Sequence, residues 1–257
     1  MEKSRANRIR ISEFFVSVQG EGPKTGVPTA FMRTAGCNFR CSGWGVETTL
    51  PNGEVVTGCD SPHSVFPEIF MRPGGSTFLT PEELFEKTPQ FPENICLTGG
   101  EPLLQAKALT QWVEMVVRRG QTVEVFTNGS ILVPEEEIWT SPSVSYVMDY
   151  KPKWSGDGGK FKVENLERLR SGDCVKFVCK NYEDYREATN FIDAHPEFTG
   201  TWLIGAVYGE MNPQTLIEWI IDDGRPRVHL NLQTQALISS EDGETFDESE
   251  RSMSKIV

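Results

Sequence analysis

Three cysteines in one stretch constrain this chain more than any other feature of its sequence. Cys37 and Cys41 follow a short apolar run and Gly36, a residue that permits a sharp turn, and Cys59 completes the group after a long insertion. Cysteine thiolates are preferred ligands of zinc and of iron–sulfur clusters, so the stretch is predicted to hold a soft metal centre. Because the sequence offers no obvious fourth cysteine nearby, a centre with one position open for chemistry is favoured.

A structural zinc site is the alternative interpretation of the same cysteines. Such a site needs four protein ligands, and His63 is the neighbouring candidate for the fourth. A zinc-stabilised binding module of the Cys3His type, which would use Cys37, Cys41, Cys59 and His63, is therefore a hypothesis from a different functional class.

The insertion before the third cysteine is predicted to be a β-hairpin. Two β-prone runs, 46–50 and 54–57, flank Pro51-Asn52-Gly53, and Asn-Gly is a strong signal for a hairpin turn. Because paired strands lie about 4.8 Å apart, a hairpin returns to its starting point. It can leave Cys59 nearly as close to Cys41 as a tight loop would.

Composition narrows the class of protein. With 38% apolar and 24% charged residues the chain is typical of a globular protein, and one domain is predicted over residues 1–238. Acidic side chains crowd residues 239–257, which are predicted to form a flexible tail. A net charge of −12 argues against nucleic-acid binding, and no apolar run predicts a membrane span or a signal peptide. A cytoplasmic protein with reduced cysteines is expected.

Apolar strand-like runs alternate with helical patterns from residue 95 to residue 232, and the predicted helices include segments near 135–139 and 163–170. Before them, Thr80-Pro81-Glu82-Glu83 gives an N-cap, a proline at the first helical position and a glutamate at the third, which predicts a helix start with a capping box. This alternation predicts an α/β protein whose parallel sheet is either an open doubly wound sheet or a partial barrel. In both architectures, polar groups at the carboxyl ends of the strands face the site. The groups at such positions are Gln19, Arg33, the cysteine stretch, Thr98-Gly99-Gly100-Glu101, Thr127-Asn128 and Lys151.

Several motifs follow one another in a specific order over about half of the chain. They are Gln19-Gly20-Glu21-Gly22, Arg33, Cys37-x3-Cys41 with Cys59-Asp60-Ser61, Thr98-Gly99-Gly100-Glu101-Pro102-Leu103 and Thr127-Asn128-Gly129. In this order they resemble the radical S-adenosylmethionine superfamily and, within it, the 7-carboxy-7-deazaguanine synthase family (QueE family). The resemblance implies a partial barrel of the (β/α)6 type, here with the hairpin inserted in its cluster loop.

The resemblance also implies a role for each motif. Cys37, Cys41 and Cys59 would hold three irons of a [4Fe–4S] cluster and leave the fourth iron for S-adenosylmethionine. The implied cofactor contacts are Gly99, Gly100, Glu101, Asp149, Tyr150 and Lys151. The implied substrate contacts are Val18, Gln19, Gly20, Glu21, Arg33 and Thr98, and Ser61 is the implied Mg²⁺ ligand.

The activity implied by the resemblance is that of a carbon–nitrogen lyase of queuosine-type biosynthesis. The substrate would be a pterin, 6-carboxy-5,6,7,8-tetrahydropterin, whose ring contracts with loss of ammonia. A homodimer and an electron donor such as a flavodoxin or ferredoxin are implied as well. The nearest enzyme alternative is another small member of the superfamily, such as a glycyl-radical activase, which need not display Gln19-Gly20-Glu21-Gly22 together with Arg33.

The chain departs from the family pattern in several places. The third cysteine follows the second after a longer gap than usual, and Asp149-Tyr150-Lys151-Pro152 stands where the family has Ser-Pro-Lys-Pro. Gln235 stands where a histidine is common, and the chain continues into its acidic segment instead of ending at a proline that reaches the substrate.

Overall fold

The computed structural model describes residues 7–235, and one nine-stranded sheet dominates them. The strand order is β11-β10-β9-β8-β7-β6-β2-β1-β5. The strands of this sheet are β1 (Ile9–Val18), β2 (Pro28–Thr34), β5 (Thr77–Leu79), β6 (Asn94–Gly99), β7 (Thr122–Thr127), β8 (Val144–Asp149), β9 (Cys174–Cys179), β10 (Thr201–Ala206) and β11 (Val228–Asn231).

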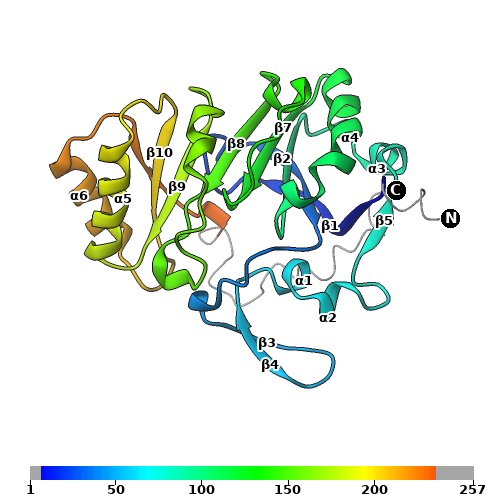
Figure 1. Cartoon of the computed structure of the whole chain (residues 1–257), viewed down its shortest axis with the longest axis horizontal. Helices are drawn as coiled ribbons and strands as arrows, with labels where there is room; N and C mark the ends of the chain where they lie inside the picture. The colour runs from blue at the N-terminus through cyan, green and yellow to red at the C-terminus, as the bar shows by residue number, and fades with distance from the viewer. Residues whose placement is uncertain (1–6, 236–257) are drawn as a thin grey trace.

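From β2 through β6 to β11, every neighbouring pair of strands is parallel. The connections carry α4 (Ala106–Arg118), α5 (Tyr182–Ala194) and α6 (Pro213–Asp223), and Figure 1 shows these helices on the outer side of a curved sheet. The predicted α/β class and partial-barrel architecture are confirmed. The other connections contain the short 3-10 helices η3 (Pro102–Gln105), η4 (Glu137–Thr140), η5 (Lys153–Ser155) and η6 (Val163–Glu167).

Two of these short turns correct the sequence prediction. Helices were predicted near residues 135–139 and 163–170, but the chain forms only η4 and η6 there. An isolated helix needs several turns before its hydrogen bonds offset the cost of nucleation, and these segments are too short for that.

The first strand runs against the others, which corrects a second prediction. β1 is antiparallel to β2, and Val18 pairs with Pro28, the first residue of β2. The loop after β1 therefore begins at the amino-terminal edge of the parallel strands, not at their carboxyl edge as predicted. Gln19 therefore enters the concave side of the curved sheet from its amino-terminal edge, whereas the cysteine loop lies at the carboxyl edge.

Helices α3 and α4 pack together beside this part of the sheet. The predicted capping box of α3 (Pro81–Lys87) is confirmed: Thr80 Oγ1 accepts from Glu83 N at 3.2 Å, and Glu83 Oε2 accepts from Thr80 N at 2.8 Å. The inner face of α4 buries Trp112 and Val116 completely. Burial of each such side chain stabilises the fold by about 1.5–3 kcal/mol, which fixes the strands that carry the site.

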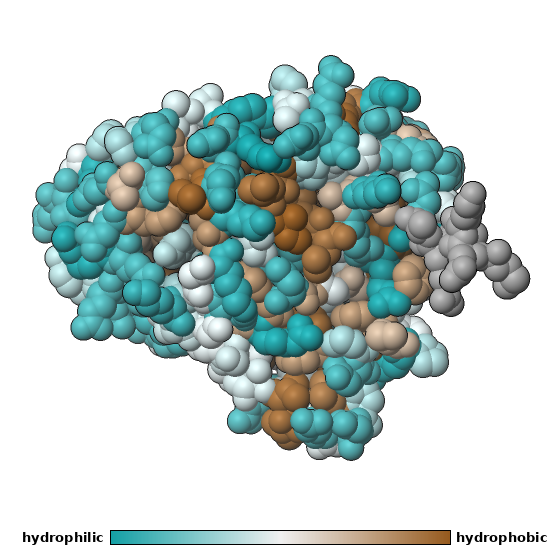
Figure 2. All heavy atoms as spheres, in the orientation of Figure 1, coloured by the Kyte–Doolittle hydropathy of each residue, from teal (hydrophilic) through white to brown (hydrophobic). Residues whose placement is uncertain are grey.

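The predicted hairpin is confirmed as β3 (Val46–Thr49) and β4 (Val55–Gly58), a separate two-stranded sheet. It follows η2 (Ser42–Trp44) and precedes the short helices α1 (Pro62–Val65) and α2 (Pro67–Phe70). Figure 2 shows apolar side chains at the lower end of the molecule, where Figure 1 places the hairpin. The hairpin exposes Val46 and Val55.

Within residues 7–235, no helix combines the length and apolar character needed to cross a bilayer. The predicted tail at 239–257 lies outside the described residues, and the boundary of a single domain at residue 238 stays a prediction.

Candidate active site

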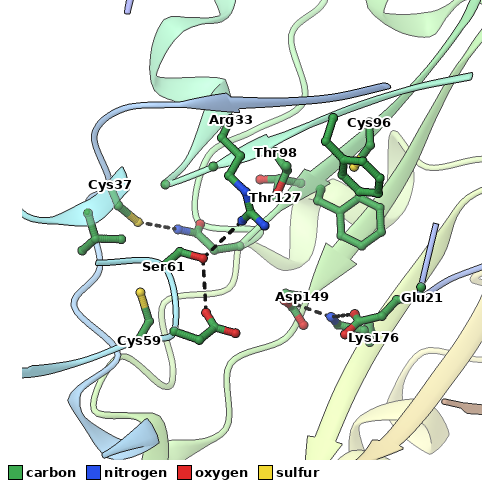
Figure 3. A pocket seen from close by; sticks show the side chains of 18 of the residues that line it. Glu21, Arg33, Cys37, Cys59, Ser61, Cys96, Thr98, Thr127, Asp149 and Lys176 are labelled. Carbon is green, nitrogen blue, oxygen red and sulfur yellow. Dashed lines mark hydrogen bonds and ion pairs between the residues drawn. The ribbon is translucent and has the colours of Figure 1, made fainter. Parts of the chain in front are cut away.

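A cavity of about 310 Å³ lies between the curved sheet and the cysteine loop (Figure 3). It brings together all but two of the site residues predicted from the sequence. Those that line it are Val18, Gln19, Gly20, Glu21, Arg33, Cys37, Cys41, Cys59, Ser61, Thr98, Gly99, Gly100, Asp149 and Lys151.

The cysteine loop is held in shape by backbone hydrogen bonds. Cys59 N donates to Arg40 O at 3.2 Å, which closes the hairpin insertion. Asp157 Oδ2 accepts from the N–H groups of Arg40 and Cys41 at 2.8 and 2.7 Å. Cys41 adopts a left-handed backbone with φ of 51°, a conformation that costs a non-glycine residue energy and is often found at functional sites.

Burial keeps the three thiols protonated in the absence of a ligand. It raises the pKa of Cys37 to about 11 and that of Cys41 to about 12, and it raises the pKa of Cys59 as well. The Lys151 ammonium opposes each shift. A cationic metal centre favours the thiolate, so these groups are suited to ligation more than to nucleophilic attack.

His63 is not gathered with the cysteines. Its Nε2 lies 3.3 Å from Glu13 Oε2 instead. In the part of the chain that the structure describes, no group of three or more His, Cys, Asp or Glu side chains is arranged around a single metal position. A Cys3His zinc site needs four ligands around one metal ion, and the arrangement does not favour it. An iron–sulfur cluster binds each cysteine to a different iron, so its ligands can lie farther apart.

Two glycines bring the end of β6 against the start of the cysteine loop. Gly99 has φ of +118°, and Gly100 N donates to Thr34 O at 3.0 Å. A Cβ on Gly100 would lie 2.2 Å from Gly36 O, so only glycine permits this approach. The backbone here is open to a ligand in the cavity.

Glu101 is one of the two predicted residues that do not line the cavity. Its carboxyl is fully buried, where Oε1 accepts from Leu103 N and Thr127 Oγ1 and Oε2 accepts from Asn128 N at 2.7 Å. Burial raises its pKa to about 7 despite these donors. The side chain joins the ends of β6 and β7, so any cofactor contact would come from its backbone.

Tyr150 is the second predicted residue that does not line the cavity. It follows Asp149 at the end of β8, and its ring packs 5.0 Å from Phe177 and 4.8 Å from Phe191. Successive side chains of an extended chain point to opposite faces, so Asp149 and Lys151 face the cavity while Tyr150 joins the core.

A buried series of charges crosses the cavity. Lys151 Nζ lies 3.1 Å from Asp149 Oδ2, and Lys176 Nζ lies 3.4 Å from the same oxygen. Lys176 Nζ also lies 2.6 Å from Glu21 Oε2. Burial would raise the pKa of Glu21, but the Lys176 ammonium and the Gln233 amide together outweigh it and hold that pKa below its usual range. Lys176 was not among the predicted site residues, although a lysine in the otherwise apolar run Cys174–Cys179 was a visible signal.

Arg33 organises another wall. Its Nε pairs with Glu13 Oε2 at 2.9 Å, and its Nη1 donates to Ser61 Oγ at 3.3 Å. Ser61 Oγ in turn donates to Asp60 Oδ1 at 3.3 Å. Beside them, the rings of Phe15 and Phe31 stack with centroids 4.9 Å apart. These aromatic residues were not predicted to line the site, because the sequence alone does not distinguish an apolar strand residue that faces a cavity from one that is buried in the core.

The loop after β1 meets the last described residues. Gln19 Nε2 donates to the buried Glu124 Oε2 at 2.6 Å. Thr234 N donates to Gly20 O at 3.0 Å, and Gln233 Nε2 donates to Glu21 Oε1 at 2.7 Å. The segment 233–235 therefore closes the cavity at the amino-terminal edge of the sheet.

Comparison with known proteins identifies relatives over most of the chain. A 7-carboxy-7-deazaguanine synthase of Methanospirillum hungatei is 32% identical over 231 residues, which cover 89% of this chain and 86% of that protein. One of Koribacter versatilis is 32% identical over 248 residues, which cover 90% and 96%. No protein-family model matches the chain.

A solved structure has the same fold. The crystal structure of QueE from Escherichia coli superimposes with a TM-score of 0.67 at 18% identity, covering 88% of this chain and 94% of that one. That likeness shows the fold, and the two relatives in sequence show the family: the chain belongs to the 7-carboxy-7-deazaguanine synthase family.

Proposed function

We propose that this chain converts 6-carboxy-5,6,7,8-tetrahydropterin into 7-carboxy-7-deazaguanine, with ring contraction and loss of ammonia. One observation carries the proposal: the cysteine loop and the 18–21 segment, predicted for cofactor and substrate, line the same cavity. The names of the relatives support the same activity. Neither of them is named as a glycyl-radical activase, the competing enzyme hypothesis.

The donor set fits a [4Fe–4S] cluster and S-adenosylmethionine. Cys37, Cys41 and Cys59 are free thiols on one loop, and the other described cysteines lie in β6 and β9. Those three would hold three irons, and one coordination position would be left for the methionyl end of S-adenosylmethionine. When bound, the pair supplies one-electron cleavage and a carbon radical that takes a hydrogen atom from the substrate.

The protein's own residues bind and orient around these groups. Gly99 and Gly100 bring bare backbone to the cavity wall, where amide and carbonyl groups can contact the cofactor. Lys151 and Asp149 offer one donor and one acceptor on the opposite wall. The stacked pair Phe15 and Phe31 gives a flat apolar surface that excludes water and suits a planar ring.

Polar groups along the rest of the cavity suit a carboxylated pterin. Arg33 has a planar guanidinium, and such a group binds a carboxylate through two nitrogens. Gln19 and Glu21 offer an amide and an ionised carboxylate to the ring's N–H and carbonyl groups. Val18 and Thr98 line the space between.

Mg²⁺ is proposed to bind at Ser61. This hard cation prefers oxygen ligands, and Ser61 Oγ lies beside Asp60 Oδ1 at the edge of the cavity. Its neighbour Arg33 is the proposed partner of the substrate carboxylate, so metal and substrate oxygens would meet there.

We propose a single domain, a homodimer, a cytoplasmic location and a flavodoxin or ferredoxin as reductant, all on the resemblance to the family. The absence of disulfides among the described cysteines agrees with a reducing compartment.

Anaerobic turnover tests the proposed function. The reconstituted enzyme is incubated with S-adenosylmethionine, reductant, Mg²⁺ and the carboxytetrahydropterin, and products are identified by mass. We expect 7-carboxy-7-deazaguanine and ammonia, and neither from the Cys59→Ala variant. Cleavage of S-adenosylmethionine without consumption of the pterin would contradict the substrate assignment.

A further inference from the structure

We propose that Lys176 is a positioning residue that couples the two halves of the cavity, because one ammonium group holds Glu21 on the substrate side and Asp149 on the cofactor side. The inference rests on the proposed function and deepens it. Lys176 belongs to none of the motifs that carry the family resemblance.

The geometry places Lys176 at the centre of a continuous series of contacts (Figure 3). Its Nζ lies 2.6 Å from Glu21 Oε2 and 3.4 Å from Asp149 Oδ2, and the side chain is only 9% exposed. Asp149 Oδ2 continues to Lys151 at 3.1 Å, and Glu21 Oε1 continues to Gln233 at 2.7 Å. Because both carboxylates contact the same ammonium group, a shift in the position of one carboxylate shifts the other as well.

One carboxylate oxygen of Asp149 is available to accept a hydrogen bond from a ligand. Its Oδ1 is buried and has no hydrogen-bond partner among residues 7–235, while Oδ2 holds both lysines. A buried carboxylate oxygen without a donor is unfavourable, so a bound molecule that donates there would be stabilised. Lys176 fixes the direction in which Oδ1 points.

The loop side is held in the same way. Gly22 N donates to Asn231 Oδ1 at 2.9 Å, and Thr234 N donates to Gly20 O at 3.0 Å, on either side of Glu21. Without Lys176, Glu21 would be a buried carboxylate facing a second carboxylate, Asp149, across the cavity. It would turn toward solvent and carry these loop contacts with it.

Coupling of this kind is reciprocal, because the effect of one ligand on the affinity of another equals the reverse effect. We expect the pterin to tighten S-adenosylmethionine binding about tenfold, and S-adenosylmethionine to tighten pterin binding by the same factor.

Binding without turnover tests the coupling. The reconstituted enzyme is kept free of reductant, and the affinity for each ligand is measured by equilibrium dialysis with and without the other. Lys176→Met should weaken pterin binding at least tenfold and bring the coupling factor to one, and Lys176→Arg should restore part of both. Lys107→Met is the control, since Lys107 is exposed on α4 and does not line the cavity. An unchanged coupling factor in Lys176→Met would overturn the proposal.

A ligand-free measurement separates this inference from the proposed function. Hydrogen–deuterium exchange of the amides of Gly22 and Thr234 should accelerate in Lys176→Met, while exchange in β3 and β4 stays the same. Glu21→Gln breaks the series from the loop side and should give the same pattern if Lys176→Met does not fold. Failure of the wild type to bind the pterin would count against the proposed function alone, whereas unchanged exchange at both amides would refute the positioning role.

Discussion

Cys59 donates its backbone N–H to the carbonyl oxygen of Arg40 at 3.2 Å, so the third cysteine returns to the residue that precedes the second. The hairpin between them pairs Val46 with Gly58 and closes on itself. A long separation in sequence is thereby converted into a short one in space.

Replacement of Cys59 by alanine is expected to abolish the cluster and the activity. The variant keeps two thiols on the loop, which cannot hold three irons. Iron content and visible absorption of anaerobically reconstituted protein are the measurements. Cys179→Ala, which removes a buried thiol from β9, is the control and should keep wild-type iron content. A full cluster in Cys59→Ala would show that the ligand assignment is wrong and would make Cys96, which also lines the cavity, the next candidate.

Replacement of Ser61 by alanine is expected to raise the Mg²⁺ concentration for half-maximal activity about tenfold, equivalent to about 1.4 kcal/mol of lost binding, because one oxygen ligand of a hard cation is removed. Iron content should not change. Ser76→Ala is the control, because Ser76 Oγ bonds Phe70 O outside the cavity. The Mg²⁺ titration of the rate is the measurement, and an unaltered titration curve would remove Ser61 from the metal site.

The three cysteines, the glycines of β6 and the order of strands and helices were readable from sequence because each depends on local chemistry. Thiols select soft metals, Asn52-Gly53 favours a hairpin turn, and Thr80 with Glu83 forms a capping box. These features need no knowledge of distant parts of the chain.

The features that were missed depend on long-range pairing. The direction of β1 is set by its antiparallel pairing with β2 and β5, and no pattern within residues 9–18 reveals it. The meeting of Lys176 with Glu21 depends on the curvature of the whole sheet. The family resemblance implies a cofactor contact for Glu101, and no local pattern reveals that buried bonds to Thr127 and Asn128 turn its side chain inward.

Glu101 is expected to make stability depend on pH in a defined direction. Burial raises the pKa of this carboxyl in the folded state from its ordinary 4.5 to about 7, so the folded state binds the proton more tightly than the unfolded state. Its stabilising contribution is therefore complete below pH 4.5 and is lost as the pH rises to about 7. One pKa unit corresponds to about 1.4 kcal/mol, so the total change is about 3 kcal/mol.

Glu101→Gln provides the reference without titration. Denaturant unfolding at pH 4.5, 6 and 8 should give an advantage of wild type over variant that shrinks with rising pH. Glu164→Gln, on the exposed turn η6, should leave the wild-type pH dependence intact. An advantage that grows with pH would mean that the donors from Thr127 and Asn128 outweigh burial.

Gly20→Ala is expected to weaken the pterin site without unfolding the protein. A Cβ on Gly20 would lie 1.9 Å from Gln235 Oε1, the far end of a flexible side chain, so the clash is relieved by displacing Gln235. Gln235 Nε2 donates to Glu21 Oε1 at 3.3 Å, and its displacement disturbs the carboxylate proposed to bind the ring.

We expect KM for the pterin to rise about tenfold, equivalent to about 1.4 kcal/mol of lost binding, with kcat nearly unchanged. Gly172→Ala is the matched control, because a Cβ there meets nothing within 4 Å. Gln235→Ala alone removes the same bond to Glu21 without a clash and should raise KM to a similar extent, whereas a wild-type KM in that variant would place the defect of Gly20→Ala in the backbone of the loop instead.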